Sequence, residues 1–170
     1  INNDISDIST MNYSTSSTTF NAFGIRITTT GAFNIYNNSV NLFGAVPNVG
    51  TTPHFSAAIM FISGTTIDLR NNVFVNTQNG LTGAKSYAIY ATVANTAFAS
   101  TTNRNNYFVS GANGVLGYIA TADRTTLTDW QTAIASSKDA NSISSAPGFN
   151  ANNNLRPTTG SALLNAGATV

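Results

Sequence analysis

Short segments in which apolar and polar residues alternate occur along the first part of the chain. Residues 33–36 (Phe-Asn-Ile-Tyr) and 67–70 (Ile-Asp-Leu-Arg) have this period of two. Successive side chains of a β-strand point to opposite faces, so the pattern predicts strands with one buried face. Further apolar segments at 24–27, 58–61 and 88–91 predict a second set of strands. The side chains expected to face inward on the first set are Phe33, Ile35, Ile67 and Leu69.

Asn-Asn pairs recur between these strands at a nearly constant interval. They stand at residues 2–3, 37–38, 71–72 and 105–106, so the intervals are 35, 34 and 34 residues. A constant period in this range is typical of stacked repeat folds. In the third copy the apolar segment lies 17 residues before its pair instead of 13, which predicts an insertion at about 95–101. Each pair is followed two residues later by an apolar residue that starts a third strand: Ile5, Val40, Phe74 and Phe108.

One unit of this length cannot bury an apolar face alone, whereas stacked units can. Helical repeats have similar lengths, but the 3.6-residue period is missing and Gly and Asn are frequent within the units. The sequence therefore predicts an all-β solenoid.

Four segments carry a resemblance to a known architecture: Gly-Ile-x-Ile at 24–27, Ile-Tyr-Asn-Asn-Ser-Val at 35–40, Leu-Arg-Asn-Asn-Val-Phe at 69–74 and the ending at 160–167. They resemble the right-handed parallel β-helix of pectate lyases and of many secreted bacterial repeat proteins. The resemblance implies about five rungs, a short helix and an irregular last rung. It also implies corner Asn side chains in a ladder, because Asn tolerates a left-handed backbone; which Asn of each pair faces inward stays open. The ladder candidates are Asn37, Asn38, Asn71, Asn72, Asn105 and Asn106.

The repeat stops near residue 125, so we divide the single domain into repeat units (1–124) and a closing segment (125–170). Thr126 and Asp129 have the spacing of a capping box, and Leu127, Trp130 and Ile134 fall on one helical face. We expect a helix at about 126–136 with Trp130 facing the stack. The chain begins inside the first Asn-Asn unit, and we expect it to be a piece of a longer protein.

Composition narrows the function classes. The 170 residues include no Cys and only six acidic side chains, and the net charge is +1. The absence of Cys excludes disulfides and thiol catalysis, and the balanced charge provides no basic surface for nucleic acid. No apolar segment approaches the roughly 20 residues that cross a bilayer. We therefore expect no nucleic-acid partner, no membrane insertion, and no metal or other cofactor.

Catalysis is not predicted. Hydrolases and lyases of this architecture use clustered carboxylates, or a base with calcium, in a groove. The Asp residues here do not repeat in register. His54 is the one histidine, and its Pro-containing segment at 51–55 predicts an exposed loop residue and not a general base.

One outward column is the candidate binding site. Tyr36, Arg70 and Arg104 each precede an Asn-Asn pair, so they are expected to stack about 4.8 Å apart, with Asp68 beside Arg70. Such a column would hold a glycan or another acidic polymer through stacking and charged hydrogen bonds. In the alternative interpretation it is a surface cluster in which Arg70 lies over Tyr36 and pairs with Asp68. A second outward column is mixed in chemistry and is interpreted as ordinary surface: Arg26, Met60 and Tyr90.

The expected function is that of a non-catalytic, extracellular or cell-surface module of an adhesion-type protein. The candidate partner is a polysaccharide. One alternative is a structural subunit that associates end to end into a filament, since the terminal rungs of a solenoid expose strand edges. A further alternative is a fragment of a polysaccharide lyase or glycoside hydrolase whose groove lies partly outside this chain.

Overall fold

The computed structural model describes residues 2–9, 21–46, 54–80 and 83–169. This part of the chain is mostly β, with one α-helix. The strands of the repeat region are β1 (Asp4–Ser6), β2 (Phe23–Ile27), β3 (Ala32–Tyr36), β4 (Ser39–Leu42), β5 (Phe55–Phe61), β6 (Thr66–Arg70), β7 (Val73–Asn76), β8 (Lys85–Ala91), β9 (Asn106–Val109) and β10 (Gly114–Ile119). The remaining elements are the 3-10 turn η1 (Asn95–Ala97), β11 (Ala122–Arg124), α1 (Leu127–Ile134), β12 (Phe149–Ala151) and β13 (Asn154–Pro157).

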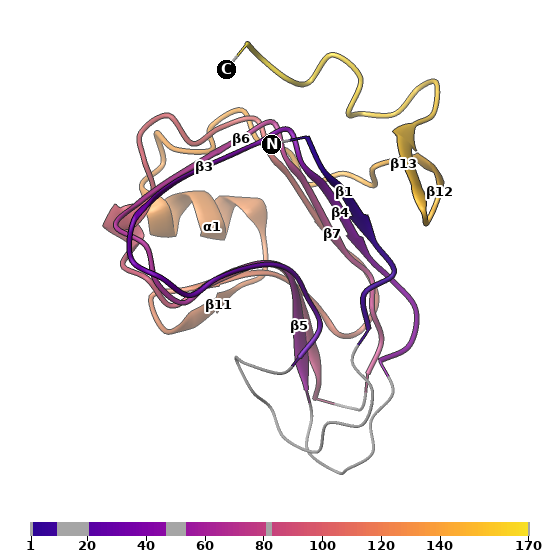
Figure 1. Cartoon of the computed structure of the whole chain (residues 1–170), viewed down its shortest axis with the longest axis horizontal. Coiled ribbons are helices and arrows are strands. Elements are labelled where there is room, and N and C mark those ends of the chain that lie inside the picture. Colours follow the sequence, from indigo (N-terminus) through magenta and orange to yellow (C-terminus); the bar gives the residue numbers. More distant parts are fainter. Residues whose placement is uncertain (1, 10–20, 47–53, 81–82, 170) are drawn as a thin grey trace.

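Parallel pairing joins each repeat strand to its equivalent in the next repeat. Strands β2, β5, β8 and β10 lie side by side in one sheet, β1, β4, β7 and β9 in a second, and β3 and β6 in a third. From β1 to β10, strands that follow one another in the chain thus belong to different sheets, and in Figure 1 the successive passes lie over one another. The strands expected at 24–27, 33–36, 58–61, 67–70 and 88–91 are all present. Strand β10 was not predicted.

The third pass departs from the predicted register. The sheet of β3 and β6 continues there only as single bridges from Ile67 to Phe98 and from Arg70 to Asn103, with η1 inside the predicted insertion. Asn103, and not Arg104, therefore follows Arg70. After the corner, Phe74 on β7 pairs with Tyr107 on β9, whereas Phe108 was expected at this position. The prediction is wrong by one residue here, because the third pass uses the first Asn of its pair where the earlier passes use the second.

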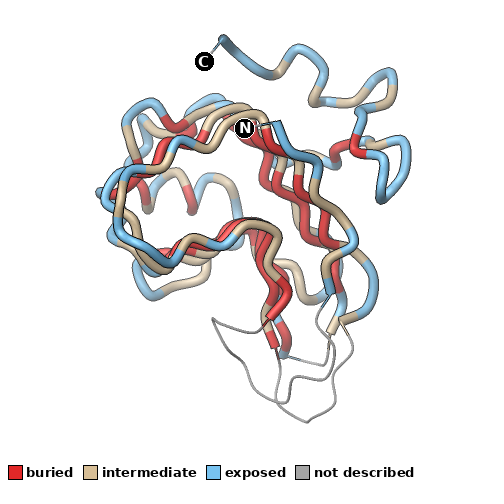
Figure 2. Tube along the Cα trace, viewed as in Figure 1, coloured by how far each residue is buried: buried red, intermediate tan, exposed pale blue. Residues whose placement is uncertain are grey.

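The main core fills the space between the sheets. Ile67 and Leu69 are fully buried, as their alternation requires, and Figure 2 shows buried residues side by side in the stacked strands. Ile35, which occupies the same face in the first pass, is only half-buried because no strand precedes β3 in its sheet. Position in the stack thus sets how strongly each equivalent side chain is buried.

A ladder of Asn side chains runs through the corner between two of the sheets. Each Nδ2 donates to Oδ1 of the next Asn at 2.9 Å, from Asn3 to Asn38, then to Asn72, then to Asn105. The other Asn of the early pairs, Asn37 and Asn71, has a left-handed backbone with φ of 56°. The inward Asn is therefore the second of each pair until the third pass. Asn106 lies outside the ladder and hydrogen-bonds the backbone of Ser145.

The ladder ends at a buried carboxylate. Oδ1 of Asp139 accepts hydrogen bonds from Asn105 Nδ2 and Ser142 Oγ, and Oδ2 accepts from Tyr107 Oη and Trp130 Nε1 at 2.9 Å each. Both oxygens of Asp139 accept in these contacts, which suits the last position of a ladder in which every amide donates forward. Helix α1 closes this end with Trp130 buried, and the predicted capping box between Thr126 and Asp129 is present.

Candidate functional site

The residues of the predicted outward column form a compact group on β3 and β6. Tyr36 Oη donates to Asp68 Oδ2 at 2.8 Å, and Arg70 donates to both Asp68 oxygens, with Nε at 3.0 Å from Oδ1. The Arg70 guanidinium lies over the Tyr36 ring, 5.1 Å from its centroid. We call these three residues the Tyr36 cluster. Its geometry is that of the surface cluster described above as the alternative to a binding column.

The polar groups of the Tyr36 cluster also stabilise the charge of Asp68 within the cluster. Burial by itself would raise the pKa of the Asp68 carboxyl, but hydrogen bonds from Arg70 and Tyr36 outweigh that effect and hold the pKa below its usual range. Both carboxylate oxygens and the phenol hydroxyl are already engaged. A ligand would have to displace these contacts, so the cluster is poorly suited to binding an acidic polymer.

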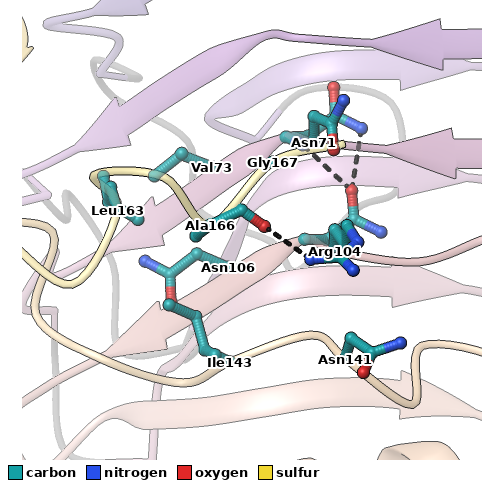
Figure 3. Close-up of a pocket in the computed structure, with 11 residues that line it drawn as sticks. Asn71, Val73, Arg104, Asn106, Asn141, Ile143, Leu163, Ala166 and Gly167 are labelled. Atoms are coloured by element: carbon teal, nitrogen blue, oxygen red, sulfur yellow. Dashed lines mark hydrogen bonds between the residues drawn. The ribbon is translucent and has the colours of Figure 1, made fainter. Parts of the chain in front are cut away.

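Arg104 does not belong to this column. It occupies the corner position of Asn37 and Asn71 and shares their left-handed backbone, with φ of 57°. Its side chain lines a pocket of about 160 Å³ between the corners and the C-terminal segment, shown in Figure 3. We call this space the corner pocket. It brings together Arg104, Asn71, Asn72, Asn105 and Asn106 from the predicted set, with Val73, Asn141, Ile143, Leu163, Ala166 and Gly167.

A second constellation, on the outer face of the β2–β5–β8–β10 sheet, was not predicted. Five aromatic side chains gather there around a small apolar cluster that is separate from the main core. We call them the aromatic cluster: Phe23, Phe55, Tyr87, Tyr90 and Tyr118. The rings of Phe55, Tyr90 and Tyr118 stack across three strands, with centroids 4.7 and 4.5 Å apart. Tyr87 meets Tyr90 edge to face at 5.2 Å.

A bend in the sheet makes this gathering possible. Ala58 and Ile59 are adjacent on β5, yet both belong to the main core, whereas Ala57 and Met60 on either side face outward. The period of two is therefore broken, and Figure 1 shows the chain turning sharply at the upper end of β5. Gly24 on β2 lets the neighbouring strand β5 approach closely at this point, because a Cβ on residue 24 would lie 2.6 Å from the Ala58 carbonyl oxygen. Outward side chains from both sides of the bend then converge.

The aromatic cluster borders an open groove with polar groups at its rim. The groove has a volume of about 280 Å³ and is lined by Tyr87, Tyr90, Tyr118, Phe55, Lys85, Gly83 and His54. Tyr87 Oη donates to Asp123 Oδ1 at 2.8 Å, and Lys85 pairs with Asp123 Oδ2. Burial, reinforced by the Asp123 hydrogen bond, raises the pKa of Tyr87, so its hydroxyl stays protonated as a donor. Within the described residues, the hydroxyls of Tyr90 and Tyr118 donate no hydrogen bond, and both side chains are half-buried.

Comparison of the chain with protein-family models, with curated proteins and with solved structures finds no match. In the described ranges, no group of three His, Cys, Asp or Glu side chains is placed to hold a metal ion, and no helix has the length and apolar character needed to cross a membrane.

Two predictions about this face are wrong. His54 is buried, with 5% of its surface exposed, whereas an exposed loop residue was expected; residues 51–53 of that segment lie outside the described ranges. The column of Arg26, Met60 and Tyr90 is not ordinary surface, since Met60 is fully buried beneath the aromatic rings and the column continues to Tyr118. The prediction missed β10, the fourth strand of this sheet, because its two glycines interrupt the apolar pattern.

Proposed function

We propose that this chain is a non-catalytic module of an extracellular, adhesion-type surface protein, folded as a right-handed parallel β-helix, and that it binds carbohydrate at the aromatic cluster. The fold part of the proposal is supported by three parallel sheets whose strands alternate along the chain and by an internal Asn ladder. The aromatic cluster is the observation that carries the binding part.

The groove presents the two kinds of contact that a sugar needs. A pyranose has apolar C–H faces and hydroxyl groups around its edge, so it packs on aromatic carbon and exchanges hydrogen bonds with polar tips. Tyr90 and Tyr118 combine both properties, since their rings form one wall and their hydroxyls make no hydrogen bond with the described residues. Lys85 adds a charged donor at the rim. Few, well-placed polar groups on a mostly apolar groove are typical of ligand sites.

Binding is better supported than hydrolysis at this place. Glycosidases use two carboxyl groups about 5–9.5 Å apart, one of which is free to donate a proton. Asp123 is the carboxylate at the described rim, and Tyr87 and Lys85 engage both of its oxygens. The described residues that line the groove include no carboxylate pair, so we place the enzymatic alternative behind carbohydrate binding.

End-to-end association into a filament also has less support. The far end of the stack is closed by α1 and by the antiparallel strand β11. The first strands of a second copy would find no parallel strand there with which to pair. The near end, where β2 and β3 lie at the edges of their sheets, has no such cover among the described elements. The near end of one copy would therefore meet a covered surface on the next copy and not an open parallel strand edge.

Glycan-array binding with matched tyrosine variants tests the proposal. Tyr118→Ala and Tyr90→Ala remove ring and hydroxyl from the groove, and Tyr36→Ala makes the same change in the Tyr36 cluster. We expect the groove variants to lose about tenfold or more of the affinity for any glycan that the native protein binds, because stacking and hydrogen bonds are lost together. Tyr36→Ala is expected to bind normally. Loss with Tyr36→Ala alone, or a native protein that binds no glycan, would count against the proposal.

A further inference from the structure

One corner of the stack carries a residue that its backbone does not favour. Three corners hold Asn with positive φ, namely Asn2 at 66° and both Asn37 and Asn71 at 56°, whereas the fourth holds Arg104 at 57°. Asn is among the residues that adopt this region most readily, and Arg is not. A disfavoured backbone that persists among favourable ones is a reason to look for a role of the side chain.

The C-terminal segment forms a roof over this corner. Asn71 holds it with two hydrogen bonds, Nδ2 to the Ala168 carbonyl at 2.6 Å and the Ala168 N–H to Oδ1 at 3.0 Å. Arg104 Nη1 donates to the Ala166 carbonyl at 3.3 Å. Figure 3 shows the segment from Leu163 to Gly167 arching over the corners, with Arg104 at one side. The guanidinium is thus oriented by the roof and uses one of its five N–H donors.

The corner pocket under this roof has an apolar side and a charged side. Val73, Ile143, Leu163 and Ala166 supply apolar surface, and all four are half-buried. On the charged side, no carboxylate of the described residues lies within ion-pair distance of Arg104. Asn141 lines the pocket as well, and its side chain makes no hydrogen bond within the described ranges.

We propose that the corner pocket binds a small carboxylate with a short, branched apolar body, anchored by Arg104. The guanidinium matches a carboxylate with two parallel N–H groups, and such charge-assisted bonds are stronger than neutral ones. The apolar body lies against Leu163 and Ile143. A space of 160 Å³ corresponds to about five waters at roughly 30 Å³ each, which is the size of a four- or five-carbon acid. This site is independent of carbohydrate binding at the aromatic cluster.

NMR titration with 3-methylbutanoate at constant ionic strength tests this assignment. We expect saturable shifts of the Arg104 side-chain N–H resonance and of the Ala168 amide. Two probes separate the parts of the ligand: 3-methylbutanamide keeps the shape without the charge, and inorganic phosphate keeps the charge without the apolar body. Each is expected to bind about tenfold more weakly or worse. Equal binding of the amide or of phosphate, or no saturation with the acid, would overturn the proposal.

Two Arg variants distinguish the pocket from general charge. Arg104→Asn removes the guanidinium and restores the residue that the other corners use, so it should abolish binding while the melting temperature stays the same or rises. Arg156→Asn removes an equal charge from the exposed strand β13 and should bind like the native protein. The site is refuted if Arg104→Asn is folded and still binds, or if both variants lose the same affinity.

Discussion

The inside of the stack repeats, and the outside does not. Inside, one Asn per pass continues the ladder, and apolar residues recur at equivalent positions such as Ile25, Ile59 and Ile89. Outside, each sheet is different: one carries the aromatic cluster, another the self-satisfied Tyr36 cluster. We infer that the repeated residues build the scaffold and that departures from the repeat mark the places where a ligand can be recognised.

A charge placed in the core should have the largest effect on stability, and its size should depend on depth in the stack. Leu69→Asp buries a carboxylate without a partner where the native side chain is fully buried, and we expect a loss of about 4 kcal/mol or more. Ile35→Asp occupies the same face in the half-exposed first pass, so its loss should be smaller, about 1–3 kcal/mol. Denaturant unfolding measures both. Native-like stability in both variants would show that this face does not point inward.

Replacing Asp139 and Asp123 by Ala compares the loss of a buried carboxylate with the loss of a partly exposed one. Asp139→Ala leaves the buried donors of Asn105, Tyr107 and Trp130 without an acceptor, and we expect a loss of about 3 kcal/mol or more. Asp123→Ala removes a partly exposed ion pair and one hydrogen bond, for an expected loss of about 1 kcal/mol. Thermal unfolding of the two variants gives the comparison directly. Equal losses would mean that the ladder terminus contributes no more than a surface contact.

A smaller effect is expected from the acid response of the Tyr36 cluster. Arg70 and Tyr36 lower the pKa of Asp68 in the folded state, overcoming the effect of burial, so the ionised carboxylate stabilises the fold above the ordinary Asp pKa of 3.8. That stabilisation is lost as the pH falls below this value and through the lowered pKa. The native protein should therefore lose more stability on acidification than Asp68→Asn does. Parallel stability curves for the two proteins against pH would contradict this assignment.

The sequence predicts the repeating part of the fold because each strand there is specified more than once. Alternation at 33–36 and at 67–70 places inward residues independently, and β3 and β6 pair in that register. The third pass is different. Arg104 stands where an Asn is expected and two Asn follow it, so counting pairs shifts the register by one residue. The pairing of Phe74 with Tyr107 and the hydrogen bond from Asn72 to Asn105 resolve it.

The aromatic cluster could not be read from alternation. The bend puts Ala58 and Ile59 on the same side, which an uninterrupted period of two cannot describe. Its rings come from strands separated by tens of residues, and Tyr118 lies on β10, where glycines conceal the strand. Only the three-dimensional arrangement brings Phe55, Tyr90 and Tyr118 into one stack.

The most direct test of the central claim is NMR shift mapping of the native protein with a glycan that it binds. We expect the shifted resonances to lie on the outer faces of β5, β8 and β10, with the largest changes at Tyr90, Tyr118 and Lys85. Shifts centred on Tyr36, Asp68 and Arg70, with the aromatic cluster unchanged, would contradict it.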